Sequence, residues 1–357
     1  MITVSLCLIV KNEEQVLGRL LDSVARLVDE IIVVDTGSTD QTKAIAEKYN
    51  AQIYDFDWID DFSAARNYAF AKATQDYIFW LDADDVLLDE DQHKFIDLKQ
   101  TLDPAVDSVT MRYNLAFDEY GNVTFSLRRN RLVKRSRNFQ WRGVVHEYLE
   151  VYGKILHSDI AVTHLDKGGD SDRNLKIYQR RLEWGEEFSP RDLYYYGNEL
   201  FDHGMYQDAI AVYERFLATG QGWVEDNIAC CGKLADCYRM VGDKEKELTS
   251  VLRAFGYDSP RAEFCCRLGY HFMEKKDYLS AIFWYRLATQ IKPRSDYLGF
   301  NNTAYSTWLP HLQLCVCYSQ LGAYRLAYLH NEAALYYRPQ DQILLNNRAW
   351  LENLLEQ

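Results

Sequence analysis

Short apolar runs alternate with segments of helical period over the first half of the chain. The runs at residues 3–10, 30–35 and 52–56 have the composition of buried parallel strands, and a fourth, YIFWL, ends directly before Asp82. Residues 12–27 are predicted to form an amphipathic helix between the first two strands. Because strand and helix alternate three times, we expect an open α/β sheet with ligands at the carboxyl ends of its strands.

Ser38 and Gln41 have the spacing of a capping box. This spacing predicts that the second helix begins directly after Ser38.

The second half of the chain has helical period throughout and is rich in Tyr, Leu and Ala. Residues 262–293 and 314–339 share an ordered series of Leu, Gly, Tyr, Ala and Pro, and weaker copies run through Gly197 and Ala235. These segments resemble the tetratricopeptide repeat (TPR), a helix–turn–helix unit of about 34 residues in which small residues let paired helices approach closely. An all-α TPR solenoid is therefore predicted.

The change of pattern marks a domain boundary. Residues 164–172 contain glycines and turn-forming residues between the two patterns. We expect an α/β domain over residues 1–170 and the TPR domain over residues 171–357.

Composition narrows the classes of function. The 357 residues are 48% apolar and carry a formal net charge of −13, a sign that repels nucleic acid and anionic lipid. No apolar run reaches the roughly 18 residues of a membrane helix, and the N-terminus lacks the features of a secretory signal. The eight cysteines lack metal-type spacing and are expected to be reduced and buried. We expect a cytoplasmic protein without a transmembrane segment or a nucleic-acid partner.

The fourth strand ends in Asp82-Ala83-Asp84. Residues i and i+2 of an extended backbone point to the same side, so both carboxylates can face one divalent cation, which in turn can bridge phosphate oxygens. The turn after the first strand, Lys11-Asn12-Glu13, has no glycine, which excludes a dinucleotide-binding or Walker-type phosphate loop. A nucleotide site that holds its diphosphate through a metal remains.

Four blocks in order, VSLCLIVKNEE, EIIVVDTGSTDQT, DFSAARNYA and WLDADD, resemble the inverting, family 2-like glycosyltransferases of the GT-A fold, a Rossmann-like mixed sheet. The resemblance implies a nucleotide-diphosphate-sugar donor, a divalent cation (Mn²⁺ or Mg²⁺) and a single displacement with inversion at the sugar carbon. It also implies which positions bind the nucleotide-sugar: Ile9, Lys11, Glu13, Asp35, Thr36, Arg66, Asp82, Ala83 and Asp84.

Within this set, Asp82 and Asp84 are also the implied metal ligands. Thr36 stands where many members of the family have a second acidic residue, which leaves the choice between uracil and guanine open. UDP is the commoner donor nucleotide in the family and is preferred.

An inverting transfer needs a group that takes the proton of the acceptor. The block FQWRGVVHEYLE resembles an element that recurs in members of the family joined to helical repeats. In this block Glu147 is the predicted base, His146 a predicted ligand of the metal or diphosphate, and Trp141 a predicted wall for the sugar or acceptor. Asp85 is an alternative base, and His164 is a second candidate ligand.

A basic cluster precedes and enters this block: Arg128, Arg129, Arg131, Lys134, Arg135, Arg137 and Arg142. It fits a segment that contacts the diphosphate or an acidic acceptor as well as it fits a charged, solvated strand edge.

The leading hypothesis is a metal-dependent transferase that moves a sugar from a UDP-sugar to a Ser, Thr or Cys side chain of a peptide or protein. The repeats would bind this acceptor or join two copies of the chain as a homodimer. One alternative acceptor is a lipid-linked or surface saccharide. An alternative of another class is an inactive transferase domain that serves a repeat-based protein-binding adaptor.

Overall fold

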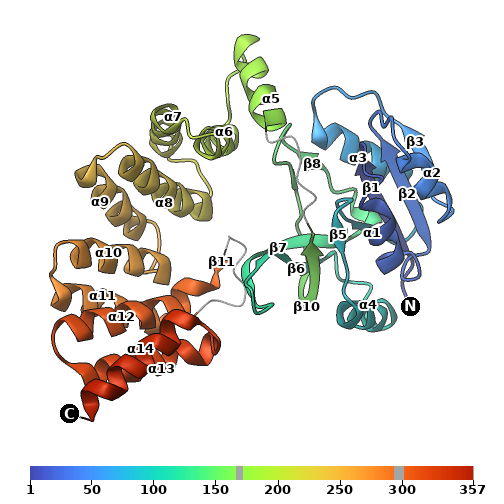
Figure 1. Cartoon of the computed structure of the whole chain (residues 1–357). Coiled ribbons are helices and arrows are strands. Elements are labelled where there is room, and N and C mark those ends of the chain that lie inside the picture. The colour runs from blue at the N-terminus through green and yellow to red at the C-terminus, as the bar shows by residue number, and fades with distance from the viewer. Residues whose placement is uncertain (166–171, 293–300, 357) are drawn as a thin grey trace. The chain divides into compact units, whose positions relative to one another are not determined.

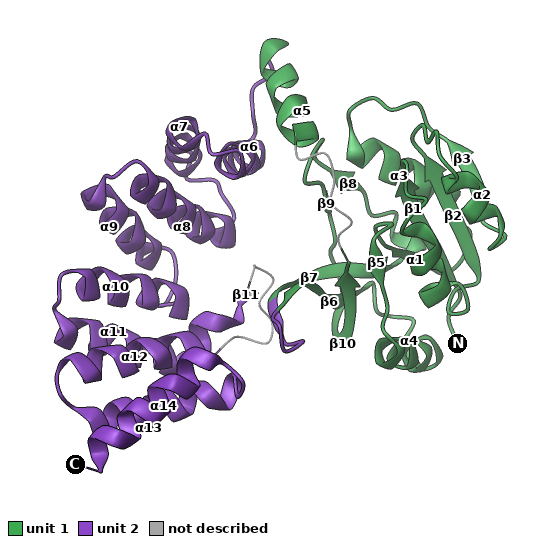
Figure 2. Cartoon of the chain, viewed as in Figure 1, with its two compact units in different colours: residues 1–117, 125–185 green, residues 118–124, 186–357 purple. Residues whose placement is uncertain are grey.

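The computed structural model describes residues 1–165, 172–292 and 301–356 (Figure 1). They form two compact units (Figure 2). Unit 1 comprises Met1–Phe117 and Phe125–Gly185, and unit 2 comprises Asp118–Thr124 and Glu186–Gln357. The predicted boundary at residue 170 lies outside the described residues and stays a prediction.

Unit 1 is built on a mixed sheet. Its parallel part has the order β3 (Gln52–Asp55), β2 (Glu30–Asp35), β1 (Val4–Val10) and β4 (Tyr77–Trp80). The sheet continues through β7 (Val123–Lys134), β6 (Ser108–Phe117), β10 (Ile155–His164) and β5 (Asp85–Val86). β7 runs antiparallel to β4, and β5 runs antiparallel to β10. A hairpin of β8 (Trp141–Arg142) and β9 (Tyr148–Leu149) forms a second, small sheet.

Helices cover both faces of this sheet. One apolar cluster joins the sheet to α1 (Leu17–Val24), α2 (Thr42–Glu47) and α4 (Asp89–Thr101), and a second joins it to α3 (Phe62–Lys72) and the small hairpin. The last helix of the unit is α5 (Asp172–Glu183). The amphipathic pattern of the first helix is confirmed, because α1 buries Leu17, Leu20, Leu21 and Val24.

Both predicted helix starts are wrong. The first helix begins at Leu17 rather than at Asn12, and α2 begins at Thr42 without a side-chain cap. The Ser38 hydroxyl instead accepts a hydrogen bond from the backbone N–H of Asn12 at 2.9 Å. A tertiary contact therefore uses the oxygen that the capping box would have used locally.

Unit 2 contains consecutive antiparallel helices of the TPR type, which confirms the expected α/β domain followed by an all-α solenoid. The helices are α6 (Pro190–Asp202), α7 (Tyr206–Ala218), α8 (Val224–Met240), α9 (Lys244–Arg253), α10 (Ala262–Glu274), α11 (Tyr278–Gln290), α12 (Trp308–Gln320), α13 (Tyr324–Tyr337) and α14 (Gln342–Leu355). A short strand, β11, spans Asn301–Asn302, and 3₁₀ helices lie at Ala254–Gly256 and Thr303–Ser306. A further 3₁₀ helix, Arg135–Arg137, belongs to unit 1.

Across both units, all eight cysteines are unpaired and buried. No helix among the described residues is long and apolar enough to span a membrane.

Glycine and tyrosine meet between paired helices, as the repeat pattern predicts. A Cβ atom at Gly269 of α10 would lie 2.8 Å from the ring of Tyr285 on α11, and one at Gly197 of α6 would lie 2.5 Å from Tyr213 on α7. Both tyrosines are buried. The glycines are therefore required for the close approach of the helices.

Gly269→Ala is expected to destabilise unit 2 by about 1–3 kcal/mol, because the new methyl group overpacks the interface with Tyr285. This loss outweighs the helix propensity of Ala. The midpoint of urea unfolding measures the effect. Gly256→Ala is the matched control, since a Cβ atom there meets no atom within 4 Å. Equal midpoints for the two variants would contradict the packing argument.

Candidate functional site

A cavity of about 370 Å³ opens at the carboxyl ends of β1 and β4 in unit 1. Most of the residues predicted from the sequence line it: Ile9, Lys11, Glu13, Thr36, Arg66, Asp82, Ala83, Asp84, His146, Glu147 and His164. Asp35, Asp85 and Trp141 do not line the cavity. The sequence reasoning gave no site role to Val10, Trp58, Phe62, Val145, Arg173 and Asn174, which also line it, and Arg129 was recognised only as part of the basic cluster.

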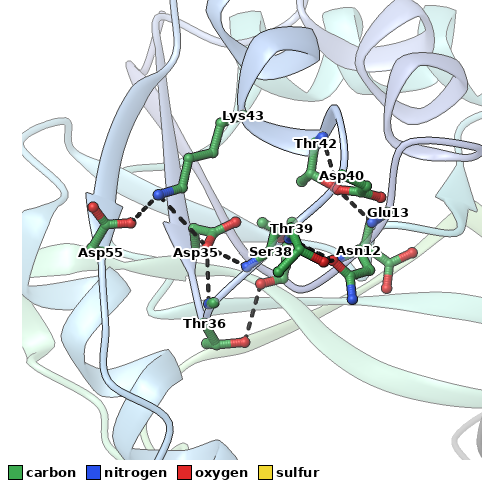
Figure 3. Close-up of polar contacts among 12 residues, drawn as sticks. Asn12, Glu13, Asp35, Thr36, Ser38, Thr39, Asp40, Thr42, Lys43 and Asp55 are labelled. Carbon is green, nitrogen blue, oxygen red and sulfur yellow. Dashed lines mark hydrogen bonds and ion pairs between the residues drawn. The ribbon is translucent and has the colours of Figure 1, made fainter.

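The loop after β1 holds its shape without a glycine (Figure 3). Asn12 itself takes the left-handed conformation (φ 56°), and its side-chain oxygen accepts a hydrogen bond from the backbone N–H of Thr39 at 2.8 Å. The next N–H, of Glu13, donates to the hydroxyl of Thr42 at 2.7 Å. These bonds fix the loops after β1 and β2 to each other beside the cavity.

Asp35, at the end of β2, is buried next to this loop. One of its oxygens accepts hydrogen bonds from the backbone N–H groups of Gly37 and Ser38, at 2.9 and 2.8 Å. Its other oxygen, Oδ2, is buried and has no hydrogen-bond partner among the described residues. Thr36 donates its hydroxyl proton to the carbonyl oxygen of Val10 at 3.1 Å, which ties β2 to β1. Thr36 therefore has no spare hydroxyl proton for a ligand in this arrangement.

Arg66 links two acidic residues of the site. Its guanidinium group lies 4.9 Å from the ring centre of Trp80 and 4.8 Å from that of Trp141. It donates hydrogen bonds to Asp82 at 2.6 Å and to Glu147. Burial would raise the pKa of Asp82, but the positive charges of Arg66 and Arg131 outweigh it and hold that pKa below its usual range. Arg66 is therefore fully engaged by carboxylates.

Trp141 does not form the predicted wall. Its side chain is 2% exposed and packs edge-on against Trp80 and Phe70 in the core. Because the residue lies beneath Arg66, it supports that guanidinium rather than facing a ligand.

Asp85 is placed where it cannot contact an acceptor, which corrects its assignment as an alternative base. The side chains of Asp85 and Arg131 are both 0% exposed, and they form an ion pair at 3.1 Å. The guanidinium of Arg131 lies between the rings of Trp80 and Tyr113, at 4.0 and 4.3 Å from their centres. Asp85 also accepts a hydrogen bond from the backbone N–H of Asp82 at 3.0 Å. Asp85 therefore anchors the acidic loop from below.

His164 is brought to Asp84 by the pairing of β10 with β5, in which His164 lies opposite Asp85. Its Nδ1 atom is 3.4 Å from a carboxylate oxygen of Asp84 and 3.5 Å from one of Asp85. Hydrogen bonds to Asp84 and Asp85 raise the pKa of His164 to about 10. In the described part of the chain, these three residues are the group of acidic and histidine side chains whose ligand atoms lie close enough to hold one metal ion.

This cluster fits a divalent cation. Carboxylate oxygens suit Mg²⁺ and Mn²⁺, and an imidazole nitrogen adds a ligand that transition metals accept. A bound cation would replace the proton that the carboxylates otherwise hold on His164. The structure therefore brings only one of the three predicted metal ligands, Asp84, into this cluster, where it lies beside His164. Asp82 forms an ion pair with Arg66 instead, and His146 lines the cavity outside the cluster.

Positive side chains line the same cavity. Among the described residues, Lys11, Arg129 and Arg173 have no carboxylate within ion-pair distance, although each lines the cavity. The rest of the basic cluster is divided. Arg137 and Arg142 pair with Asp107 and Glu150, and backbone carbonyl oxygens accept hydrogen bonds from Arg128, Lys134 and Arg135. Only part of the cluster therefore contributes to the site.

Residues 5–153 match the glycosyl transferase family 2 model. A TPR repeat-containing protein of Synechococcus elongatus is 41% identical over 150 residues, which cover 42% of this chain and 36% of that protein. The SPbeta prophage-derived glycosyltransferase SunS of Bacillus subtilis is 28% identical over 212 residues, or 56% of this chain and 49% of that protein.

Among solved structures, glucosyl-3-phosphoglycerate synthase from Mycobacterium tuberculosis, in complex with Mn²⁺ and UDP-glucose, is similar at a TM-score of 0.36. That similarity has 17% identity and covers 53% of this chain and 81% of that one. The chain spans about a third to a half of the length of the two curated relatives named here.

Proposed function

We propose that this chain, which carries a glycosyltransferase family 2 domain followed by TPR repeats, is a metal-dependent inverting transferase. It would move a sugar from a UDP-sugar to a Ser, Thr or Cys side chain of a peptide or protein. The observation that carries the proposal is the cavity in which Asp84 and His164 face positive side chains that lack carboxylate partners.

The base and the diphosphate of the donor each have a proposed contact in unit 1. Asp35, at the end of β2, is the proposed acceptor for an N–H of the base; its Oδ2 atom is buried behind the cavity wall, so this contact requires a shift of the loop after β2. Lys11 and Arg129 supply positive charge for the diphosphate. A divalent cation, with Asp84 and His164 as ligands, would neutralise charge on the leaving diphosphate. We prefer Mn²⁺ or Mg²⁺ as this ion.

Glu147 is the proposed base. Its carboxylate lines the cavity and is held by Arg66, which also holds Asp82. A carboxylate fixed beside the donor site can take the proton of an acceptor hydroxyl or thiol as the sugar carbon is attacked. Glu147→Gln keeps the shape of the side chain and removes this capacity.

Glu147→Gln is expected to lower the rate of sugar transfer by about 100- to 10,000-fold, the usual contribution of a general base. UDP affinity is expected to stay within about threefold of wild type, since charge is lost at the base and not among the phosphate-binding cations. Transfer kinetics and calorimetric UDP binding measure the two effects. A wild-type transfer rate in this variant would exclude Glu147 as the base.

The polypeptide acceptor is proposed from the repeats, because solenoids of this kind present extended surfaces that hold peptides. The same surfaces could join two copies of the chain as a homodimer. A lipid-linked or surface saccharide as acceptor would be revealed if sugar appeared in the lipid or polysaccharide fraction and not on polypeptide.

The first experiment follows UDP or GDP release across a panel of nucleotide-sugars, with and without Mn²⁺. Metal-dependent release from one donor would support the proposal and identify its sugar. Peptide arrays with that donor would then identify the acceptor. If no donor is turned over and calorimetry detects no nucleotide binding, the transferase is excluded and the adaptor is favoured.

A further inference from the structure

Helix α5 (Asp172–Glu183) contributes a side chain to the donor cavity, although it lies beyond the residues that match the family. We infer that Arg173 of α5 binds the diphosphate of the donor, and that α5 therefore forms part of the donor-binding site. This inference rests on the proposed function. It extends the site to a helix that the repeat pattern had assigned to the second domain.

Two contacts dock α5 against Asp60, in the loop that precedes α3, and against Phe62, the first residue of α3. Arg180 forms an ion pair with Asp60 at 2.6 Å. Two helical turns earlier, on the same face of the helix, the guanidinium of Arg173 lies 4.7 Å from the ring centre of Phe62. The loop itself is braced, because Asp60 accepts a hydrogen bond from the indole N–H of Trp58 at 2.8 Å, and the Trp58 and Phe62 rings meet edge-on at 4.8 Å.

These contacts place Arg173 through an aromatic ring and not through an ion pair with a carboxylate. A guanidinium that stacks on an aromatic ring keeps its N–H groups available for hydrogen bonds in the plane of the group. Arg173 has no carboxylate within ion-pair distance among residues 1–165, 172–292 and 301–356. The neighbouring Arg66 is already bound to Asp82 and Glu147. Arg173 is therefore a guanidinium free to bind a ligand at the wall of the cavity.

A phosphate group is the ligand that this arrangement favours. Lys11 and Arg129 line the same cavity and also lack carboxylate partners in the described part of the chain, so Arg173 adds to a positive group rather than neutralising an acidic one. Guanidinium groups bind phosphate oxygens with paired, charge-assisted hydrogen bonds. A diphosphate carries enough negative charge to satisfy several such cations at once.

The test measures calorimetric binding of uridine, UMP and UDP to wild type, Arg173→Ala and Lys176→Ala. Lys176 lies one turn along the same helix, pairs with Asp172 and does not line the cavity, so it is the matched control. Arg173→Ala is expected to weaken UDP binding about 10- to 100-fold, the effect of losing a charge-assisted hydrogen bond, and to leave uridine binding unchanged. Lys176→Ala is expected to match wild type.

A second pair of variants tests the docking of α5. Arg180→Gln removes the ion pair with Asp60, whereas Arg180→Lys keeps the charge. The ion pair is partly exposed, so Arg180→Gln is expected to weaken UDP binding roughly 2- to 5-fold. Arg180→Lys is expected to keep the UDP affinity of wild type. Asp60→Asn should resemble Arg180→Gln, because Asn tolerates the left-handed conformation of this position (φ 60°) and still accepts from Trp58.

Each outcome separates this inference from the proposed function. If wild type binds UDP and Arg173→Ala binds it equally well, the role of Arg173 is overturned and the transferase stands. Equal losses for uridine and UDP would overturn phosphate binding and indicate a general disturbance of the cavity. If wild type does not bind UDP, the proposed UDP-sugar transferase fails and the assignment of Arg173 fails with it.

Discussion

Asp84→Ala is expected to lower sugar transfer by at least about 1,000-fold while leaving the fold intact. Asp84 is the partly exposed carboxylate of the cluster with Asp85 and His164, and its loss removes the carboxylate ligand that lines the cavity. Stabilisation of the leaving diphosphate by a metal contributes several kcal/mol, and each 1.36 kcal/mol corresponds to about tenfold in rate. Transfer assays and Mn²⁺ binding followed by electron paramagnetic resonance measure the loss.

Asp84→Asn is the matched variant, because it keeps the size of the side chain and removes its charge. Both variants are expected to lose Mn²⁺ binding and to unfold at most slightly below the wild-type temperature, since Asp84 contacts the sheet through its backbone and through one side-chain contact with His164, which Asp85 also contacts. Full activity in either variant would refute the metal assignment. A large fall in unfolding temperature would mean that Asp84 has a structural role instead.

Arg131→Met is expected to destabilise unit 1 by about 3–5 kcal/mol. The substitution removes the buried guanidinium that pairs with Asp85, which is 0% exposed, and leaves His164, at 3.5 Å, as the remaining cationic neighbour of that buried charge. It also removes the guanidinium that lies between Trp80 and Tyr113. Because proteins are stable by only about 5–15 kcal/mol, this loss is a large fraction of the total. Urea unfolding followed by tryptophan fluorescence measures it.

The control is Arg135→Met, at an exposed member of the same basic cluster, which is expected to shift stability by less than about 1 kcal/mol. The double variant Arg131→Met/Asp85→Leu removes both charges and should recover much of the loss, since no buried charge remains unpaired. If Arg131→Met unfolds at the same urea concentration as Arg135→Met, the buried ion pair between Arg131 and Asp85 does not stabilise unit 1.

The local pattern of apolar and polar residues was enough to predict the α/β domain, the repeat domain and many of the residues that line the cavity. Burial on one side of a helix or on both sides of a strand repeats with a fixed period, so the first four strands, the helices between them and the repeat helices could be predicted along the chain. The strands β6, β7 and β10, which complete the sheet, were not predicted. The ends of β1 and β4 were also recognisable, because apolar runs stop at Lys11 and Asp82. Parallel strands end at the same edge of a sheet, which is why Lys11, Glu13, Asp82 and Asp84 meet in one cavity.

The tertiary structure decided which of the remaining charged and aromatic residues reach that cavity. From the sequence, His146 was predicted as a metal ligand and His164 was only a second candidate, but of the two it is His164 that pairs across strands with the acidic loop. Strand register depends on partners far apart in the chain and leaves no local pattern. Helix α5 likewise carries an ordinary helical period, and its docking through Arg180 is what brings Arg173 to the site.

Burial separated neighbours that look alike in the sequence. Asp84 and Asp85 are adjacent acids, and Arg129 and Arg131 belong to one basic run, yet one member of each pair lines the cavity and the other is enclosed. The sequence by itself determined the composition of these segments and their place at strand ends. The tertiary structure determined which of these charges are buried, because it assembles aromatic rings and opposite charges from distant segments around them. Burying a charge costs free energy unless an opposite charge or hydrogen bonds compensate it.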